Sequence, residues 1–256
     1  MSTWRDIWKR SLKANRLMSI DIEKGEAEFA ELARRYETEK KDGMIHYAYA
    51  EALEYRNEKE KALKEYTIAR DLFPVEHWKK VAEHSIKRLN NNQTAEDYCD
   101  KENFISYLWY TYQKVYEYVY LDDFVRYVCL SAISRADSEW PLSLVDFRSV
   151  LELQIKTTFS DLVKPYIEKK EFILSDIIDD LKTKKGIDET IIRAMHGIRI
   201  SGNAATHELK TFDEDDFENY RINNYNKDDL QSLNNLQIVL EFFNTYNKKH
   251  NIQFPE

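Results

Sequence analysis

The chain has little of what turn-rich or metal-bound folds need, because its 256 residues include only 5 glycines, 4 prolines and 2 cysteines. So few turn formers disfavour a β fold and favour helices. The cysteines, Cys99 and Cys129, lack metal-ligand spacing. Because the N-terminus also has no hydrophobic leader, we expect the protein to be located in the reducing cytoplasm.

Long apolar runs and an excess of positive charge are also lacking. No uninterrupted apolar stretch approaches the roughly 20 residues that cross a bilayer, so we expect no membrane partner. The formal net charge of -8 lacks the basic footprint of a general nucleic-acid binder. Two local charge runs stand out, a basic one in residues 1–20 and an acidic one in 213–218. Each run is typical of a solvated face, and contact between the two is the alternative.

The usual signatures of cofactor and metal enzymes are missing as well. The sequence has no glycine-rich phosphate loop, no Gly-x-Ser-x-Gly elbow and no Cys–His nucleophile pair. Its 6 histidines do not fall into metal-ligand spacing with acids or cysteines. We therefore expect neither a cofactor nor a metal.

A helical hairpin is predicted between residues 42 and 78. Small and aromatic residues recur there at helical spacing, a polar break at 56–58 separates two helices, and a proline ends the second. The segment resembles a tetratricopeptide repeat, with Tyr47 or Tyr49 standing in for the aromatic expected early in the first helix. The residues that carry this packing are Ala50, Ala62, Tyr66, Ala69 and Pro74.

One such hairpin cannot bury its own apolar face, so neighbouring helices must cover it. Residues 23–37 and 75–89 have the pattern of such neighbours. We therefore predict a domain of five antiparallel helices over residues 1–90. Its predicted role is to bind a peptide or a partner protein, and the alternative is that it only buttresses a second domain.

An apolar stripe begins the chain and is formed by Trp4, Ile7, Trp8 and Leu12. Such a helix either lies on a membrane surface or caps the helical stack. Capping is favoured, because the end of a repeat array needs a cover.

A polar linker over residues 91–103 separates this part from a second domain over residues 104–256. The segment 104–134 is crowded with tyrosines but has few lysines or arginines between them. Base stacking is one use of such a segment. Core or interface packing is favoured, since stacking platforms usually carry interleaved positive charge.

Four further helices are predicted downstream. The first starts at Trp140, with Pro141 in its first turn, and others cover residues 171–184, 188–207 and 227–247. In the first of these, Arg148 and Glu152 are spaced to pair along the helix. We therefore predict an all-α fold throughout.

The C-terminal pattern is specific enough to suggest a family. Phe147-Arg-x-x-Leu-Glu152 is followed by Arg199-x-x-Gly-Asn-x-x-x-His207 and a terminal amphipathic helix. Over residues 140–247 this order resembles domain-of-unknown-function family 4145, which is grouped with the HEPN-like all-α domains. The resemblance implies a small helical bundle, often dimeric, met in bacterial restriction, toxin–antitoxin and anti-phage neighbourhoods.

The resemblance also implies a candidate chemistry. HEPN ribonucleases work without metal, using a histidine to move a proton and an arginine to stabilise the charged transition state. Here the residues that match these roles are His207, with Asn203 as orienting donor and Arg199 as phosphate clamp. Gly202 stands where the family usually has its arginine. On an unbroken helix Arg199 and His207 share a face but lie about 12 Å apart.

A packing role for the same residues is the alternative. Gly202 would permit close helix approach, Asn203 would cap a following turn, and His207 or Arg199 would pair with Glu152. We therefore predict a regulatory, protein-interaction component of a bacterial defence or toxin–antitoxin system, homodimeric through its HEPN-like domain. The alternative function is a metal-independent endoribonuclease with RNA as substrate, and RNA binding without cleavage is a third option.

Overall fold

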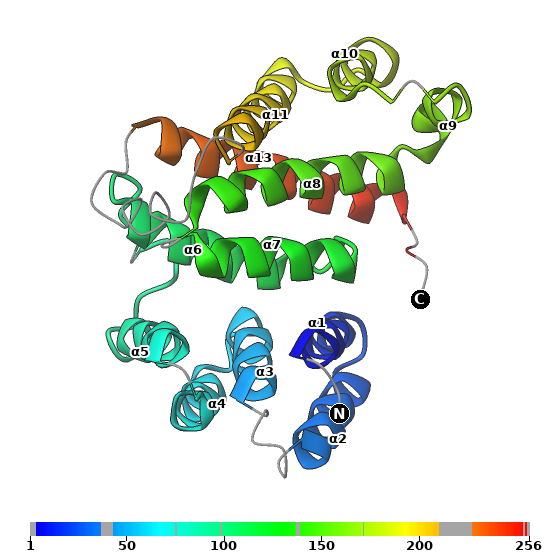
Figure 1. Cartoon of the computed structure of the whole chain (residues 1–256). Helices are drawn as coiled ribbons and strands as arrows, with labels where there is room; N and C mark the ends of the chain where they lie inside the picture. The colour runs from blue at the N-terminus through cyan, green and yellow to red at the C-terminus, as the bar shows by residue number, and fades with distance from the viewer. Residues whose placement is uncertain are drawn as a thin grey trace. The chain divides into compact units, whose positions relative to one another are not determined.

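Every element of regular structure in the described residues is an α-helix, as Figure 1 shows, so the predicted all-α fold is confirmed. The small number of glycines and prolines is the physical reason, because few positions interrupt the helical hydrogen bonding. The computed structural model describes residues 4–36, 43–74, 76–97, 99–136, 139–170, 172–209, 227–252 and 254.

The helices form two compact units. One consists of Met1–Asp100 with Tyr112–Val119, and the other of Lys101–Thr111 with Tyr120–Glu256. Helix α6 (Phe104–Glu117) therefore contributes residues to both. In this respect the units differ from the predicted domains, which place all of residues 104–256 in the second one.

The N-terminal unit is a series of helices in which neighbours in the chain pack together. Contacts join α1 to α2 and α3, α3 to α4, and α4 to α5. The first five helices are α1 (Trp4–Ile20), α2 (Ile22–Tyr36), α3 (Gly43–Tyr55), α4 (Lys59–Leu72) and α5 (Glu76–Asn90).

Helices α3 and α4 form the hairpin at the centre of this unit. The turn between them places Asn57 in the left-handed region at φ 62°, which asparagine tolerates better than most residues. Ala62, Tyr66 and Ala69 are fully buried, as is Ala50 on the facing helix. The buried ring of Tyr47 meets Tyr66 edge-on with 5.2 Å between centroids. Small residues therefore let the helices approach, and two aromatic rings fill the space between them.

Two flanking residues complete the description of the hairpin. Pro74 follows Phe73, the C-cap of α4, and is exposed. Tyr49 is half-buried and stacks on Phe29 of α2 at 4.8 Å. Tyr47 is thus the tyrosine that packs inside the hairpin.

The apolar stripe of α1 lies in the core of the N-terminal unit. Ile7, Trp8 and Leu12 are buried, and the Trp8 indole donates a hydrogen bond of 3.3 Å to the Tyr116 hydroxyl. Trp8 also meets Trp78 edge-on at 5.8 Å. These three side chains are therefore not available to a membrane surface. The side chain of Trp4 lies outside the described residues.

The aromatic segment 104–134 forms two helices, α6 and α7 (Asp123–Arg135). The Asp122 side chain caps α7 by accepting hydrogen bonds from the backbone N–H groups of Phe124 and Val125 at 2.9 and 3.2 Å. Most of the tyrosines in this segment are buried and belong to the core. This agrees with the packing role that was predicted because few lysines and arginines lie between them. The buried ones are Tyr107, Tyr110, Tyr112, Tyr116 and Tyr118.

The C-terminal unit is arranged around α8. This helix packs against α7, α11 and α13, and α10 packs on α11 (Figure 1). Gly186 ends α10 in the left-handed conformation at φ 66°, as the predicted stop requires. The remaining helices are α8 (Trp140–Thr158), α9 (Ser160–Glu168), α10 (Leu174–Lys185), α11 (Glu189–Leu209) and α13 (Lys227–His250). Of the helices in the described ranges, none is both long and apolar enough to span a membrane.

Candidate functional site

Helices α8 and α11 carry all of the predicted C-terminal site residues. Helix α11 begins after Asp188, whose carboxylate accepts a hydrogen bond of 2.8 Å from the Thr190 backbone N–H. It then runs unbroken to Leu209, straight through Gly202 and Asn203. A mid-helix glycine costs about 1 kcal/mol relative to alanine, so tertiary packing must favour it here. Because Asn203 lies inside the helix, it does not cap a turn.

The packing reason for Gly202 is its contact with α8. A Cβ atom at this position would lie 2.6 Å from the Arg148 Cβ and 2.9 Å from the Leu144 carbonyl oxygen. Neither of those atoms belongs to the flexible end of a side chain, so neither could move aside cheaply. Gly202 therefore marks a close approach of α11 to α8. The residue at the position of the expected arginine serves the contact between the two helices.

The charged residues of α8 pair along their own helix. Arg148 Nη2 lies 2.9 Å from Glu152 Oε1, and Lys156 Nζ lies 3.8 Å from Glu152 Oε2. All three side chains are part-exposed. Within the described residues, Glu152 makes no ion pair with Arg199 or His207. The predicted pairing of Glu152 with His207 or Arg199 of α11 is therefore wrong.

Arg199, Asn203 and His207 share one strip of α11, spaced four residues apart. Because the helix is unbroken, Arg199 and His207 stay eight residues apart, which is about 12 Å at 1.5 Å per residue. His207 is exposed and makes no hydrogen bond or ion pair with the residues that the structure describes. The buried Arg199 Nε likewise has no hydrogen-bond partner among them.

This geometry limits what one chain can do chemically. A general base and a cation would both have to lie within about 3 Å of the reacting atoms. A separation of about 12 Å along one helix does not provide that within a single chain. No group of three or more His, Cys, Asp or Glu side chains in the described ranges is placed to hold a metal ion.

A second feature lies in the N-terminal unit, and no sequence motif predicts it. Ile20, Ile22 and Tyr55 are large apolar residues that are 71%, 40% and 58% exposed. They belong to the α1–α2 junction and the end of α3. Helices α1 and α3 pack together, and Ser19, the residue before Ile20, lines the same small cavity as Tyr55. We call these three residues the apolar corner. Such a cluster is typical of a contact surface.

A third feature is a groove between α9 and α10, which contains three lysines. Sequence reasoning missed it because α9 has no obvious start signal, its N-cap position being Phe159. The only available hint was the group of lysines at 169, 184 and 185.

The comparisons with known proteins bear on the C-terminal unit. The model of the family named Domain of unknown function (DUF4145) matches residues 131–221, about a third of the chain. The match includes Arg148, Glu152 and the whole strip of α11, and it confirms the predicted resemblance of this part to that family. No curated protein and no solved structure matches the chain.

Proposed function

We propose that this protein is a regulatory, protein-interaction component that binds a partner through its N-terminal helices and assembles through its C-terminal unit. The apolar corner is the observation that carries this proposal. Fully burying one large, completely exposed apolar side chain gains roughly 1.5–3 kcal/mol. These three side chains still expose 40–71% of their surface, so burying them together supplies a useful anchor. The tetratricopeptide-like spacing of the α3–α4 hairpin supports the same role, because such repeats bind peptides and proteins.

The C-terminal unit is the proposed assembly module. Its resemblance to the HEPN-like domains supports homodimerisation and a setting in a bacterial defence or toxin–antitoxin system. Ile200 supports a contact through an exposed face of α11, since it is 56% exposed and follows Arg199 in the chain.

Two paired variants test these surfaces. Ile20→Ser with Tyr55→Ser removes most of the apolar corner, and we expect it to lose the protein that co-purifies with the chain from its native cells. Ile167→Ser with Ile173→Ser is the control, because those isoleucines are 55% and 53% exposed but lie on α9 and beside α10. Equal retention of the partner by both variants would show that the corner does not bind it.

The assembly half is tested by the mass of the protein in solution. We expect the wild-type chain to have the mass of a dimer and Ile200→Glu to have that of a monomer. Ile173→Glu, with nearly the same exposure, should leave the dimer intact. A wild-type chain that is monomeric at micromolar concentration would overturn this half of the proposal.

The second candidate is a metal-independent endoribonuclease. The observation that favours it is the strip of α11, where the exposed His207 lies on the same face as Arg199 and Asn203. If two copies met with their α11 helices antiparallel, Arg199 of one chain would come near His207 of the other. This function predicts RNA cleavage in EDTA that leaves 2′,3′-cyclic phosphate ends and is lost in His207→Ala. Cleavage that persists in this variant would exclude it.

A further inference from the structure

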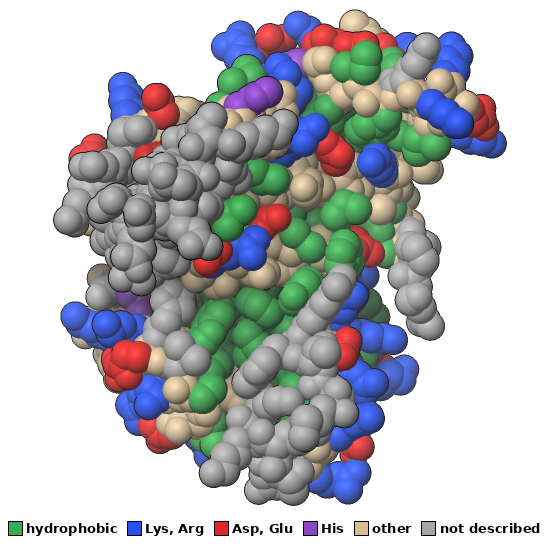
Figure 2. All heavy atoms as spheres, in the orientation of Figure 1, with side chains coloured by type: hydrophobic (Ala, Val, Ile, Leu, Met, Phe, Trp, Pro, Cys, Tyr) green, Lys and Arg blue, Asp and Glu red, His purple; other side chains and the backbone are tan. Residues whose placement is uncertain are grey.

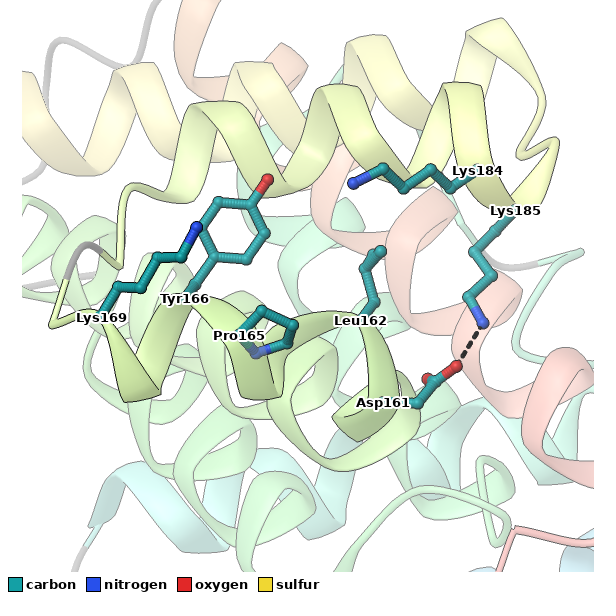
Figure 3. A pocket seen from close by; sticks show the side chains of 7 residues that line it. All are labelled: Asp161, Leu162, Pro165, Tyr166, Lys169, Lys184 and Lys185. Carbon is teal, nitrogen blue, oxygen red and sulfur yellow. Dashed lines mark hydrogen bonds and ion pairs between the residues drawn. The ribbon is translucent and has the colours of Figure 1, made fainter.

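The groove between α9 and α10 has the size of a small-ligand site. Its volume is about 500 Å³, within the range of roughly 300–1,000 Å³ common for such sites. Figure 3 shows that Asp161 and Lys185 meet at one end and that Lys169 stands beside Tyr166 at the other. The lining residues are Asp161, Leu162, Pro165, Tyr166, Lys169, Lys184 and Lys185.

The groove separates an apolar floor from a charged rim. Leu162, Pro165 and the ring of Tyr166 form the floor and come from one face of α9. In Figure 2 the surface over α9 and α10 likewise shows hydrophobic side chains between charged ones. A flat apolar group could rest on this floor while a charged group reached the rim.

The rim is cationic. Three lysines and one aspartate line the groove, and the Asp180 carboxylate paired with Lys184 adds a second acid, which leaves a net formal charge of +1. Lys185 pairs with Asp161 and Lys184 with Asp180, both at 2.6 Å. An ammonium group donates three hydrogen bonds, so each of these lysines keeps donors for a ligand. Lys169 makes no ion pair or hydrogen bond within the described part of the chain.

The aromatic part of the floor is held in place. The Tyr166 hydroxyl donates a hydrogen bond of 2.5 Å to Asp180, the same carboxylate that holds Lys184. This bond is the main reason that the pKa of Tyr166 is raised to about 12, so the hydroxyl stays protonated near neutral pH. The ring and the Lys184 ammonium are thereby fixed by a common partner.

We propose that this groove binds a nucleoside phosphate, with the phosphate at Lys169 and Lys184 and the base against Tyr166 and Pro165. Lysine ammonium groups bind phosphate as point charges, and bases stack on aromatic faces. The ligand is either a free mononucleotide or one nucleotide of a single-stranded RNA, because both present the same chemistry. The site is separate from the apolar corner and from α11, so it does not depend on the proposed partner binding.

The test uses the full chain and two probes. Fluorescence anisotropy measures the binding of a labelled short single-stranded RNA, and calorimetry measures that of ATP. The groove variant is Lys169→Gln with Lys184→Gln. The control is Lys164→Gln with Lys182→Gln, which changes the net charge equally on α9 and α10 but outside the groove lining.

We expect the groove variant to bind at least about tenfold more weakly and the control to stay within about twofold of wild type. Tyr166→Ala should also weaken binding, and more than Tyr166→Phe, which keeps the ring. If ATP binds and RNA does not, the ligand is a free nucleotide, and the reverse result indicates a strand. No binding of either probe would overturn the proposal, as would equal losses in the groove and control variants or equal affinity for a glutamate-rich peptide.

Discussion

Two ion pairs, one from each compact unit, serve different purposes. In the N-terminal unit, Arg88 of α5 is 1% exposed, and its Nη2 lies 2.6 Å from Glu54 of α3, which also accepts a hydrogen bond from Tyr66. In the C-terminal unit, Arg148 and Glu152 are 33% and 22% exposed and lie on the same helix. The first pair clamps separate helices together. The second pair does not join two helices, and its charges stay partly exposed at the surface.

The contrast separates structural charges from available ones. When a buried charge loses its partner, it remains as an unpaired ion in a medium of low polarity. The stability of the fold therefore depends on keeping both members of a buried pair. A part-exposed pair along one helix contributes little to stability and is free to interact with something else. By this criterion the α8–α11 region is where charge can serve binding, and the core around Glu54 is where it serves folding.

The largest expected effect comes from breaking the buried pair. Glu54→Gln should lower the free energy of unfolding by about 2–3 kcal/mol, because Arg88 then loses its carboxylate partner. Glu152→Gln should cost less than about 1 kcal/mol. Urea unfolding of both variants measures the difference. Equal losses would remove the distinction between the two ion pairs.

The second effect is on pH dependence in the N-terminal unit. Burial raises the pKa of Glu51 to about 8, and nearby Glu54 adds to the shift, so this carboxyl is protonated in the folded state while the unfolded chain ionises near pH 4.5. The folded state then binds more protons, and its stability falls as pH rises towards 8. Burial lowers the pKa of His84 to about 4, so this histidine is neutral in the folded state, while half of it is still protonated in the unfolded chain at pH 6.5. Its contribution opposes the decline by only about 0.4 kcal/mol between pH 6.5 and 8.

Between pH 6.5 and 8 we therefore expect the free energy of unfolding to drop by up to about 2 kcal/mol. Glu51→Gln removes the titrating group and should flatten this decline. Urea unfolding at several pH values in this window provides the measurement. A decline of the same size in the variant would assign the pH dependence to another group.

The third and smallest effect compares two glycines of α11. Gly202→Ala should destabilise the C-terminal unit by about 1–2 kcal/mol, since its Cβ meets the Arg148 Cβ and a backbone carbonyl of α8. The Cβ that Gly197→Ala adds would contact only the side-chain amide of Asn235, which can rotate away. The gain in helix propensity should therefore make this substitution neutral or slightly stabilising. Thermal unfolding of the two variants checks this order. If Gly202→Ala were the more stable one, the close approach would not be a packing constraint.

Much of the fold follows from helical periodicity, and the departures have local causes. The hairpin, the start at Trp140, the stop at Gly186 and the terminal helix are all where apolar spacing, proline and glycine predict them. The division of 104–134 into α6 and α7 depends on the side-chain cap at Asp122. The sequence contains this capping residue, but the aromatic residues on both sides of it suggest one continuous segment. Helix α9 has no capping side chain at Phe159, and its packing against α8 defines it instead.

The candidate site was harder to predict than the fold. The sequence identifies the strip Arg199, Asn203 and His207, but whether Gly202 and Asn203 break the helix depends on what packs against them. Propensity favours a break, while the contact with Arg148 and Leu144 favours continuity, and the contact prevails. The apolar corner combines residues from α1, α2 and α3, and the groove combines residues from α9 and α10, so no single sequence motif predicts either of them.

Crosslinking at the apolar corner tests the central claim most directly. A photoreactive residue placed at Ile20 in the native cells should give one discrete adduct of higher mass. The same residue at Ala30, which is also exposed on the N-terminal unit, should give none. Identical adducts from both positions, or none from either, would contradict a partner bound at this corner.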